Sequence, residues 1–216
     1  MPTDEAEDLG APERRGSGLV MRVLLALLIL LVGVGAGLAA GLNIASPDHP
    51  ADDSAEAGFL RDMATHHAQA VDMGSIVYPK ATNAEVRSMG LDTALTQHGQ
   101  VNIMQTWLRE WGLNPNGTEP PMAWMPNGQA SMQDGLMPGM ATQQQMEELR
   151  KAEGKQADIL YLTLMRQHHL GGIHMAQEIL KMSDNENVTG IAKTIMESQQ
   201  YEITAMTDLL SQVQAS

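Results

Sequence analysis

The feature that most constrains this chain is a string of residues that occurs twice, 102 positions apart. The members of the two copies are Met63, His66, His67 and Met73, and then Met165, His168, His169 and Met175. Each copy therefore places a pair of adjacent histidines between two methionines. A repeat at one constant offset indicates a duplicated structural unit.

The repeat continues well beyond the histidines. At the same offset a second set of polar and sulfur-containing residues matches, Gln97, Gln100 and Met104 with Gln199, Glu202 and Met206. One ungapped offset covering about 50 residues in each copy is what two copies of a helical hairpin would give. The sequence therefore predicts an all-α fold, a pseudo-symmetric antiparallel four-helix bundle of the ferritin-like kind, built from two duplicated hairpins.

Local signals set the predicted helix ends. The four long helices are expected from Ser54 to Tyr78, from just after Thr82-Asn83 to Gly112, up to about Ser183-Asp184, and from Glu186 to Val213. Pro79 ends the first of them. A short extra helix is predicted to open at the capping box Thr142-x-x-Gln145 and to break near Gly154. The duplicated domain is thus placed at 54–213, with a Met-, Pro- and Gly-rich loop at 113–141.

The N-terminal part predicts export. Residues 1–18 are polar and rich in Gly and Pro and are expected to form a disordered tail. The 22 residues from Val23 to Ile44 carry no charge, enough to cross a hydrocarbon core of about 30 Å as a helix. The predicted organisation is a cytoplasmic tail, a transmembrane anchor or uncleaved signal at 19–45, and a linker at 46–53.

Arginines precede the apolar segment and aspartates follow it, so the positive-inside rule predicts a single-pass protein of the cell membrane. Its N-terminus is expected in the cytoplasm and its main domain outside. A cleaved signal peptide, with Gly37-Leu38-Ala39 as the cleavage site, stays open as the alternative. Either interpretation exports the main domain.

Composition narrows the chemistry. The chain has no cysteine, which excludes disulfides and cysteine-ligated zinc or iron–sulfur sites. It has 17 methionines and a formal net charge of −13. The negative charge argues against nucleic acid as a partner and favours cations. Beyond a metal ion and the membrane, the sequence leaves homo-oligomerisation open.

Helical geometry puts the repeated residues on one face. At about 100° per residue, Met63, both histidines that follow it and Met73 fall within one stripe. Small residues beside the histidines, such as Gly74, Gly171 and Gly172, would let a partner helix approach closely. His174 lies off the stripe, which makes it at most a peripheral ligand.

Imidazole and thioether together favour copper. Imidazole suits several transition metals, whereas thioether selects strongly for Cu(I) among common biological metals. The predicted metal ligands are Met63, His66, His67, Met73, Met104, Met165, His168, His169, Met175 and Met206. Secondary candidates are His174, Gln97, Gln100, Gln199, Glu202, Met122, Met125, Met137 and Met140.

Rival chemistries lack their motifs. A di-iron carboxylate centre in a four-helix bundle needs Glu-x-x-His on two helices, and the sequence contains none. A catalytic zinc site needs three ligands and a nearby base, and no His-Glu-x-x-His string is present. No nucleophile motif appears either. The sequence therefore gives no argument for an enzyme.

With these residues in place, the chain resembles the bacterial domain-of-unknown-function family 305. The resemblance rests on Phe59-Leu60-x-x-Met63-x-x-His66-His67 and Tyr161-Leu162-x-x-Met165-x-x-His168-His169, and on Met137-Pro138-Gly139-Met140. It covers about 52–213 and implies a ferritin-like helical bundle. Exported members of that family are associated with copper binding and tolerance, which the resemblance implies here. One departure is Asp72, which stands where the second copy has His174.

The loop methionines allow two interpretations. Met122-x-x-Met125 and Met137-x-x-Met140 have a spacing with which exposed thioethers in a flexible loop can capture Cu(I). Alternatively, these methionines fill gaps where the loop crosses the bundle.

Two functions remain open from the sequence. The first is an extracytoplasmic copper-binding protein that acts in metal buffering, tolerance or transfer. The second is a structural or interaction bundle without metal, tethered to the membrane, in which the glutamines and Glu202 merely satisfy the buried histidines. His98 is expected to be a hydrogen-bonded core residue, and Asp62, four residues before His66, to pair with that histidine or lie in a surface salt bridge.

Overall fold

The structure is a computed structural model that describes residues 17–45 and 49–216. The chain divides into two compact units, Met1–Asp48 and His49–Ser216. In the described residues all regular elements are helices, apart from one isolated bridge between Gln133 and Leu136. The predicted all-α class is confirmed.

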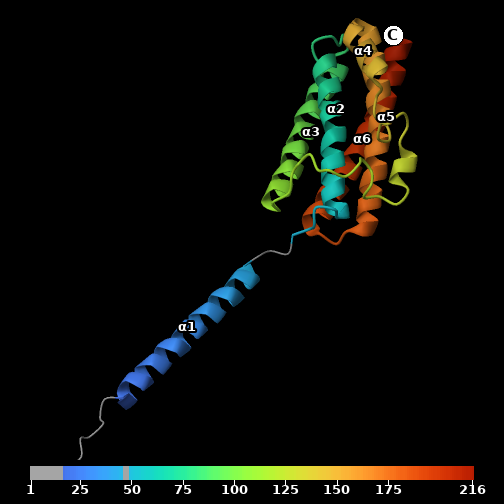
Figure 1. The fold of residues 1–216 in the computed structure, drawn as a ribbon. Helices are drawn as coiled ribbons and strands as arrows, with labels where there is room; N and C mark the ends of the chain where they lie inside the picture. The colour runs from blue at the N-terminus through green and yellow to red at the C-terminus, as the bar shows by residue number, and fades with distance from the viewer. Residues whose placement is uncertain (1–16, 46–48) are drawn as a thin grey trace, which may run out of the picture. The chain divides into compact units, whose positions relative to one another are not determined.

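The first unit contains one apolar helix, α1 (Ser17–Ala45), drawn in blue in Figure 1. Its stretch Gly18–Leu38 is long and apolar enough to cross a membrane, a property that signal sequences share. Most of the predicted tail at 1–18, and positions 46–48 of the predicted linker, lie outside the described residues.

The second unit is a bundle of four long helices. They are α2 (Ala55–Val77), α3 (Ala84–Glu110), α5 (Gly154–Met182) and α6 (Glu186–Ala215), with the short α4 (Gln143–Lys151) and the 3-10 helix η1 (Gly128–Ser131) in the connection. Helix α2 packs on α3, α5 packs on α6, and the two hairpins meet through α2 and α5 (Figure 1). The predicted bundle of two hairpins is confirmed.

Helices α2, α3 and α4 begin at residues whose side chains cap them. Ser54 accepts a hydrogen bond from the backbone of Ala57, and Asn83 accepts two at the start of α3. Thr142 and Gln145 form the predicted capping box of α4. Thr82, the residue before Asn83, donates its hydroxyl to Asp158 at 2.8 Å.

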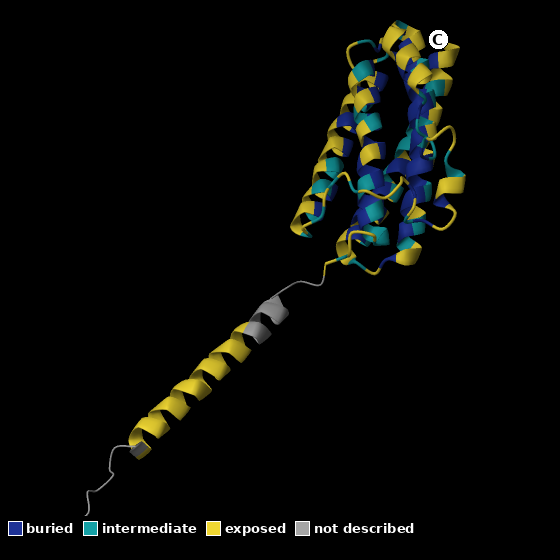
Figure 2. Cartoon of the chain, viewed as in Figure 1, coloured by how far each residue is buried: buried dark blue, intermediate teal, exposed yellow. Residues whose placement is uncertain are grey.

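Two apolar clusters show how α2 and α5 run. Residues from the first half of α2, Phe59 and Met63, cluster with Met175 from the second half of α5. Residues from the end of α2, such as Met73, cluster with Tyr161 near the start of α5. Because beginnings meet ends, α2 and α5 are antiparallel. Figure 2 shows the buried residues along the inward faces of the four helices.

A close approach of α2 and α3 depends on small residues. A Cβ atom added at Gly74 would overlap the carbonyl oxygen of Gly90. The prediction that Gly74 admits a partner helix is therefore confirmed. Gly171 and Gly172 have other neighbours, which belong to the description of the histidines.

Candidate metal centre

The four histidines of the repeated string lie together where α2 meets α5, and all four are completely buried, His66, His67, His168 and His169. The rings of His66 and His168 face each other with centroids 3.7 Å apart and an angle of 33° between their planes. Within each adjacent pair the centroids are 6.4 Å apart, because consecutive residues on a helix diverge by about 100°. The two copies of the repeated string thus lie in one layer of the core.

Two of the histidines bond to backbone carbonyl groups. Nε2 of His66 lies 3.0 Å from the carbonyl oxygen of Pro138, and Nε2 of His168 lies 2.9 Å from that of His66. A carbonyl oxygen can only accept, so the hydrogen of each ring is on Nε2.

The other two histidines bond to side chains of the outer helices. Nε2 of His67 lies 2.8 Å from Oε1 of Gln100 on α3, and Nε2 of His169 lies 2.6 Å from Oε2 of Glu202 on α6. These contacts place the hydrogen of both rings on Nε2 as well. Gln100 and Glu202, secondary candidates from the sequence, therefore hold the histidines in position.

The second nitrogen of every histidine is left without a partner. All four Nδ1 atoms are buried and make no hydrogen bond in the described residues. Leaving one buried polar atom unpaired costs about 1–3 kcal/mol. Histidines that bind metals characteristically donate the hydrogen of one nitrogen to a nearby oxygen and present the lone pair of the other nitrogen. These four rings have that arrangement.

Three of these histidines, His66, His67 and His168, are neutral at neutral pH because burial lowers the pKa of each ring. Burial lowers the pKa of His66 to about 4, against the opposing effect of the Pro138 carbonyl. Burial lowers the pKa of His67 to about 3, and the nearby His66 adds to the effect. Burial also lowers the pKa of His168, to which the other three histidines contribute. Their lone pairs are therefore available without competition from protons near pH 7.

The six predicted methionine ligands divide into two buried groups, Met63, Met104 and Met175 in one cluster, and Met165, Met206 and Met73 in the other. All six are completely buried. Each group takes two methionines from one hairpin and the third from the other, because α2 and α5 are antiparallel.

Two glutamines of the repeat are buried without full pairing. Gln97 and Gln199 are each 3 % exposed, and the unpartnered atoms are Oε1 of Gln97 and both amide atoms of Gln199. Gly172 makes room for Gln199: a Cβ there would lie 2.6 Å from Oε1. Gly172 thus admits a side chain of α6, not the helix backbone that the sequence led us to expect.

The donor set fits a soft metal ion better than a hard one. In the part of the chain that the structure describes, no three His, Asp or Glu side chains gather closely enough to hold one ion. A centre formed here needs methionine sulfur beside imidazole nitrogen. Met63 and Met165 precede their histidine pairs by three and four positions and share a helix side with them. Nitrogen with thioether is a donor set that suits Cu(I).

The loop methionines are packed into the bundle. Met122, Met125 and Met137 are 0 %, 6 % and 5 % exposed and belong to the apolar cluster around Met63. Met140 is partly buried against that cluster. The interpretation as exposed, flexible thioethers is wrong, because these side chains fill space where the loop crosses α2 and α5. The alternative, gap filling, describes them.

Three polar residues near the histidines lie elsewhere than the sequence suggested. His98 is exposed, since its neighbour Gln97 takes the inward position. Asp62 does not bond to His66; its Oδ2 atom accepts from the backbone of Met122 at 2.7 Å and from the indole of Trp124 at 2.8 Å. His174 is only partly buried and lies off the inward stripe, as predicted.

Sequence reasoning did not predict where residues 137–141 lie, which is over His66. The Pro138 carbonyl contacts His66, and Ala141 is held by two hydrogen bonds to Gln69. A Cβ at Gly171 would overlap the Pro138 carbonyl, and Gly139 has a positive φ of 79°. Gly171 therefore admits a loop, where a helix was expected. The glycines in both segments were the available signal, but nothing in the sequence paired them.

Comparison with known proteins places the chain. The profile of the domain of unknown function DUF305 matches residues 56–210. The chain belongs to the DUF305 family. One similar solved structure is a DUF305 protein from Streptomyces coelicolor, provisionally described as secreted. It shares 43% sequence identity over 76% of this chain and 96% of its own, with a TM-score of 0.69. A DUF305 fragment from Deinococcus radiodurans shares 30% identity over 73% of this chain and 96% of its own, with a TM-score of 0.61.

A more distant solved structure with a similar fold is that of CopM in a Cu(I)-bound form. It shares 21% identity over 76% of this chain and 98% of its own, with a TM-score of 0.57. At that identity the likeness shows the common fold. A search of curated proteins finds no match.

Proposed function

We propose that this DUF305 protein binds copper outside the cytoplasm, with histidine and methionine ligands, in metal buffering, tolerance or transfer. The observation that carries the proposal is the set of four buried histidines whose Nδ1 atoms have no partner while every Nε2 atom is bonded to an oxygen. A buried network with a purely structural role would be expected to pair both nitrogens.

The residue roles follow from the contacts. The Nδ1 atoms of the histidines would bind copper together with Met63 and Met165, with fewer than three histidines on any one ion. The other methionines of the two groups, Met73, Met104, Met175 and Met206, would supply further sulfur. Gln100 and Glu202 would keep the rings in place through Nε2. In this role copper would be the ion that the protein stores or passes on, and its binding would not change the geometry of the chain.

The fold comparison supports the same chemistry. CopM, which shares this fold, has been solved with Cu(I), with Cu(II) and with silver. Silver and Cu(I) are soft monovalent ions that prefer sulfur and imidazole donors. The same donor types are buried together in this chain.

Helix α1 would tether the domain to the membrane. Its stretch Gly18–Leu38 is wholly apolar apart from Arg22 and is exposed along its length. With arginines before it and aspartates after it, the segment would leave the second unit on the outer side. The same segment would act as a signal sequence if it is cleaved.

The test compares copper binding by two matched histidine variants of the full-length protein in detergent, purified without oxygen. Asparagine replaces His66, His67, His168 and His169 in the first, and the exposed His49 and His98 in the control. We expect Cu(I) affinity, measured by competition with a chelator, to fall at least about 100-fold in the first variant, since each lost ligand costs on the order of tenfold or more. The control should bind like the native protein. Equal binding by both variants, or no binding by the native protein, would refute the proposal.

A second variant guards against misfolding. Met104→Leu with Met206→Leu conserves side-chain volume, which cores tolerate. We expect thermal melting to change little and Cu(I) affinity to fall about tenfold or more, with a smaller loss for Cu(II) because thioether favours the monovalent ion. A structural bundle without metal predicts no copper-dependent rise in melting temperature for any of these proteins.

A further inference from the structure

The two halves of the histidine centre differ at one position. The His67 half consists of Met63, His67, Gln97, Gln100 and Met104, and the His169 half of Met165, His169, Gln199, Glu202 and Met206. Four of the five positions carry the same residue type in both halves. The fifth is Gln100 in the first half and Glu202 in the second, 33 residues after the histidine that each one contacts.

The two contacts differ in strength. The carboxylate of Glu202 lies 2.6 Å from Nε2 of His169, whereas the amide oxygen of Gln100 lies 2.8 Å from Nε2 of His67. Hydrogen bonds to a charged acceptor are shorter and roughly twice as strong as neutral ones. A carboxylate behind a histidine raises the basicity of the nitrogen on the opposite side of the ring, and such partners change metal affinity about 10–100-fold. Nδ1 of His169 is therefore the stronger donor.

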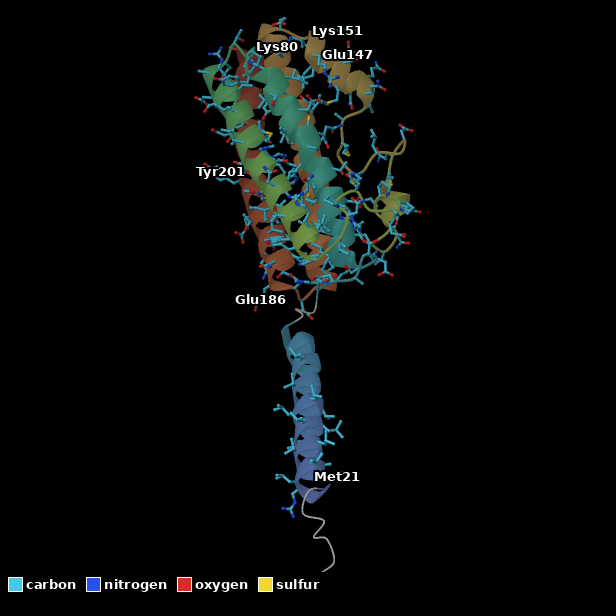
Figure 3. The ribbon with its side chains drawn as sticks, turned by 60° about the vertical axis from the view of Figure 1, so that its left-hand side comes forward. Met21, Lys80, Glu147, Lys151, Glu186 and Tyr201 are labelled. Atoms are coloured by element: carbon cyan, nitrogen blue, oxygen red, sulfur yellow. The ribbon has the colours of Figure 1, made fainter. Side chains whose placement is uncertain are left out.

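The surface groove beside Glu202 also differs in charge from the groove beside Gln100. Helices α3 and α6 leave a groove of about 350 Å³ beside Glu202, lined also by Glu85 and Asp92. Glu202 is 26% exposed and reaches from this groove to the completely buried His169. Tyr201, which lines the same groove, is 78% exposed and points away from the bundle (Figure 3). Three carboxylates and no basic side chain line this groove.

The matching groove beside Gln100 is nearly neutral. It measures about 460 Å³ and lies between Trp107 and Ile103 of α3 and the first turns of α6. Glu186, labelled in Figure 3, is its single charged residue. A divalent cation gains more from three nearby carboxylates than from one, and the gain decreases with salt.

From this contrast we infer that Glu202 makes the two halves unequal. The His169 half takes the first copper ion and accepts Cu(II), and the His67 half binds more weakly and favours Cu(I). Divalent copper prefers nitrogen and oxygen surroundings with negative charge, whereas the neutral half offers imidazole, amide and thioether. Glu202 is thus a positioning residue that determines which half binds copper first and which oxidation state of copper that half accepts. The inference rests on the proposed copper function.

The test exchanges the two residues in the full-length protein in detergent. Glu202→Gln gives both halves an amide, Gln100→Glu gives both a carboxylate, and the double variant moves the carboxylate from one half to the other. Cu(II) is added stepwise and followed by electron paramagnetic resonance and calorimetry. The native protein should show one tight step and a second step about 10–100-fold weaker.

Each variant has a distinct expected result. Glu202→Gln should weaken the first step about 10–100-fold, so that the two steps merge, while Cu(I) affinity changes less. Gln100→Glu should strengthen the second step, and the double variant should restore one tight step. Glu197→Gln, which removes an exposed carboxylate of α6 that lines neither groove, should leave both equilibrium steps within about threefold of native at 0.15 M salt.

The outcomes separate this inference from the copper proposal. If the native protein binds copper through its histidines and the exchanges leave both Cu(II) steps unchanged, the inference is wrong and the proposed function stands. If the native protein binds no copper, the proposed function fails. Restoration by the double variant supports the inference even if one single variant is poorly folded, because a merely structural defect would not be repaired by moving the charge.

Discussion

Gln69 and Gly171 occupy the same position in the two hairpins, 102 residues apart, yet they meet the covering segment 137–141 in opposite ways. Gln69 holds Ala141 through two hydrogen bonds, of 2.9 and 2.7 Å. Gly171 has no side chain, and the carbonyl of Pro138 lies against its backbone. A single segment contacts both hairpins, so residues at matched positions in the two copies cannot make identical contacts with it.

The matched histidines His66 and His168 also have different partners. His66 bonds to Pro138 of the covering segment, whereas its counterpart His168 bonds to the backbone of α2. Gln69 and Gly171, which touch this segment, differ in residue type, whereas the four histidines keep theirs even though their partners differ.

The largest expected effect tests what the hairpins share, the buried histidines. An unfolded histidine has a pKa near 6.5, and burial lowers the pKa of His66 to about 4 and of His67 to about 3. The native state thus binds fewer protons, so stability is complete above about pH 6.5 and is lost as the pH falls toward 4 and 3. His66 alone accounts for about 3 kcal/mol.

Urea unfolding of the metal-free protein between pH 7.5 and 4.5 measures this loss. The His98→Asn variant should follow the native curve, because His98 is exposed. A stability that stays constant down to pH 4.5 would contradict buried, unpaired histidines.

Gly171→Ala should give the next largest effect. The new Cβ would overlap the Pro138 carbonyl, which is backbone and cannot rotate away. Overpacking of this kind costs about 1–3 kcal/mol or more, and we expect the upper end, about 3 kcal/mol. Gly190→Ala in α6 is the matched control, since nothing lies within 4 Å of its Cβ, and it should stabilise the helix by up to about 1 kcal/mol. Thermal melting distinguishes the two; equal melting temperatures would mean that the segment is not held at Gly171.

Gln69→Ala should weaken the same segment from the other hairpin by about 2 kcal/mol. Ala141 is 4% exposed, so its N–H and carbonyl groups would remain buried without their partners. Hydrogen exchange of the Ala141 amide should accelerate more than that of the α3 core. If only global stability changed, the contact would not be local to residues 137–141.

The smallest expected effect concerns Phe59 and Tyr161, another pair of matched positions. The Tyr161 hydroxyl lies 3.5 Å from the Met89 carbonyl, which is long for a hydrogen bond, and Thr93 is its other polar neighbour. Tyr161→Phe should therefore change stability by less than about 1 kcal/mol. Phe59→Tyr, which buries a new hydroxyl beside Trp124, should cost more. Urea midpoints compare the two, and a larger loss at Tyr161 would show that its hydroxyl matters.

The sequence predicted a large part of the fold because the signals are local. Helical periodicity, Asn83 and the Thr142 capping box define the elements within a few residues. The offset of 102 predicted which histidines would share a layer. The prediction of exposed loop methionines was wrong, because the spacing of Met122 and Met125 does not determine which residues they pack against. The prediction that His98 is a core residue was wrong, because a step of one residue along a helix turns the side chain by about 100°.

By itself, the sequence determined two helical hairpins with matching inward faces and an apolar segment before them, since periodicity and repetition act within one helix or between copies. Only the tertiary structure decided which nitrogen of each histidine is bonded, which methionines from opposite hairpins meet, and that residues 137–141 lie over His66. Those features depend on how antiparallel helices cross and where a long loop passes, and such contacts join residues that no sequence spacing relates. The four unpartnered Nδ1 atoms at that crossing are the consequence that matters for function.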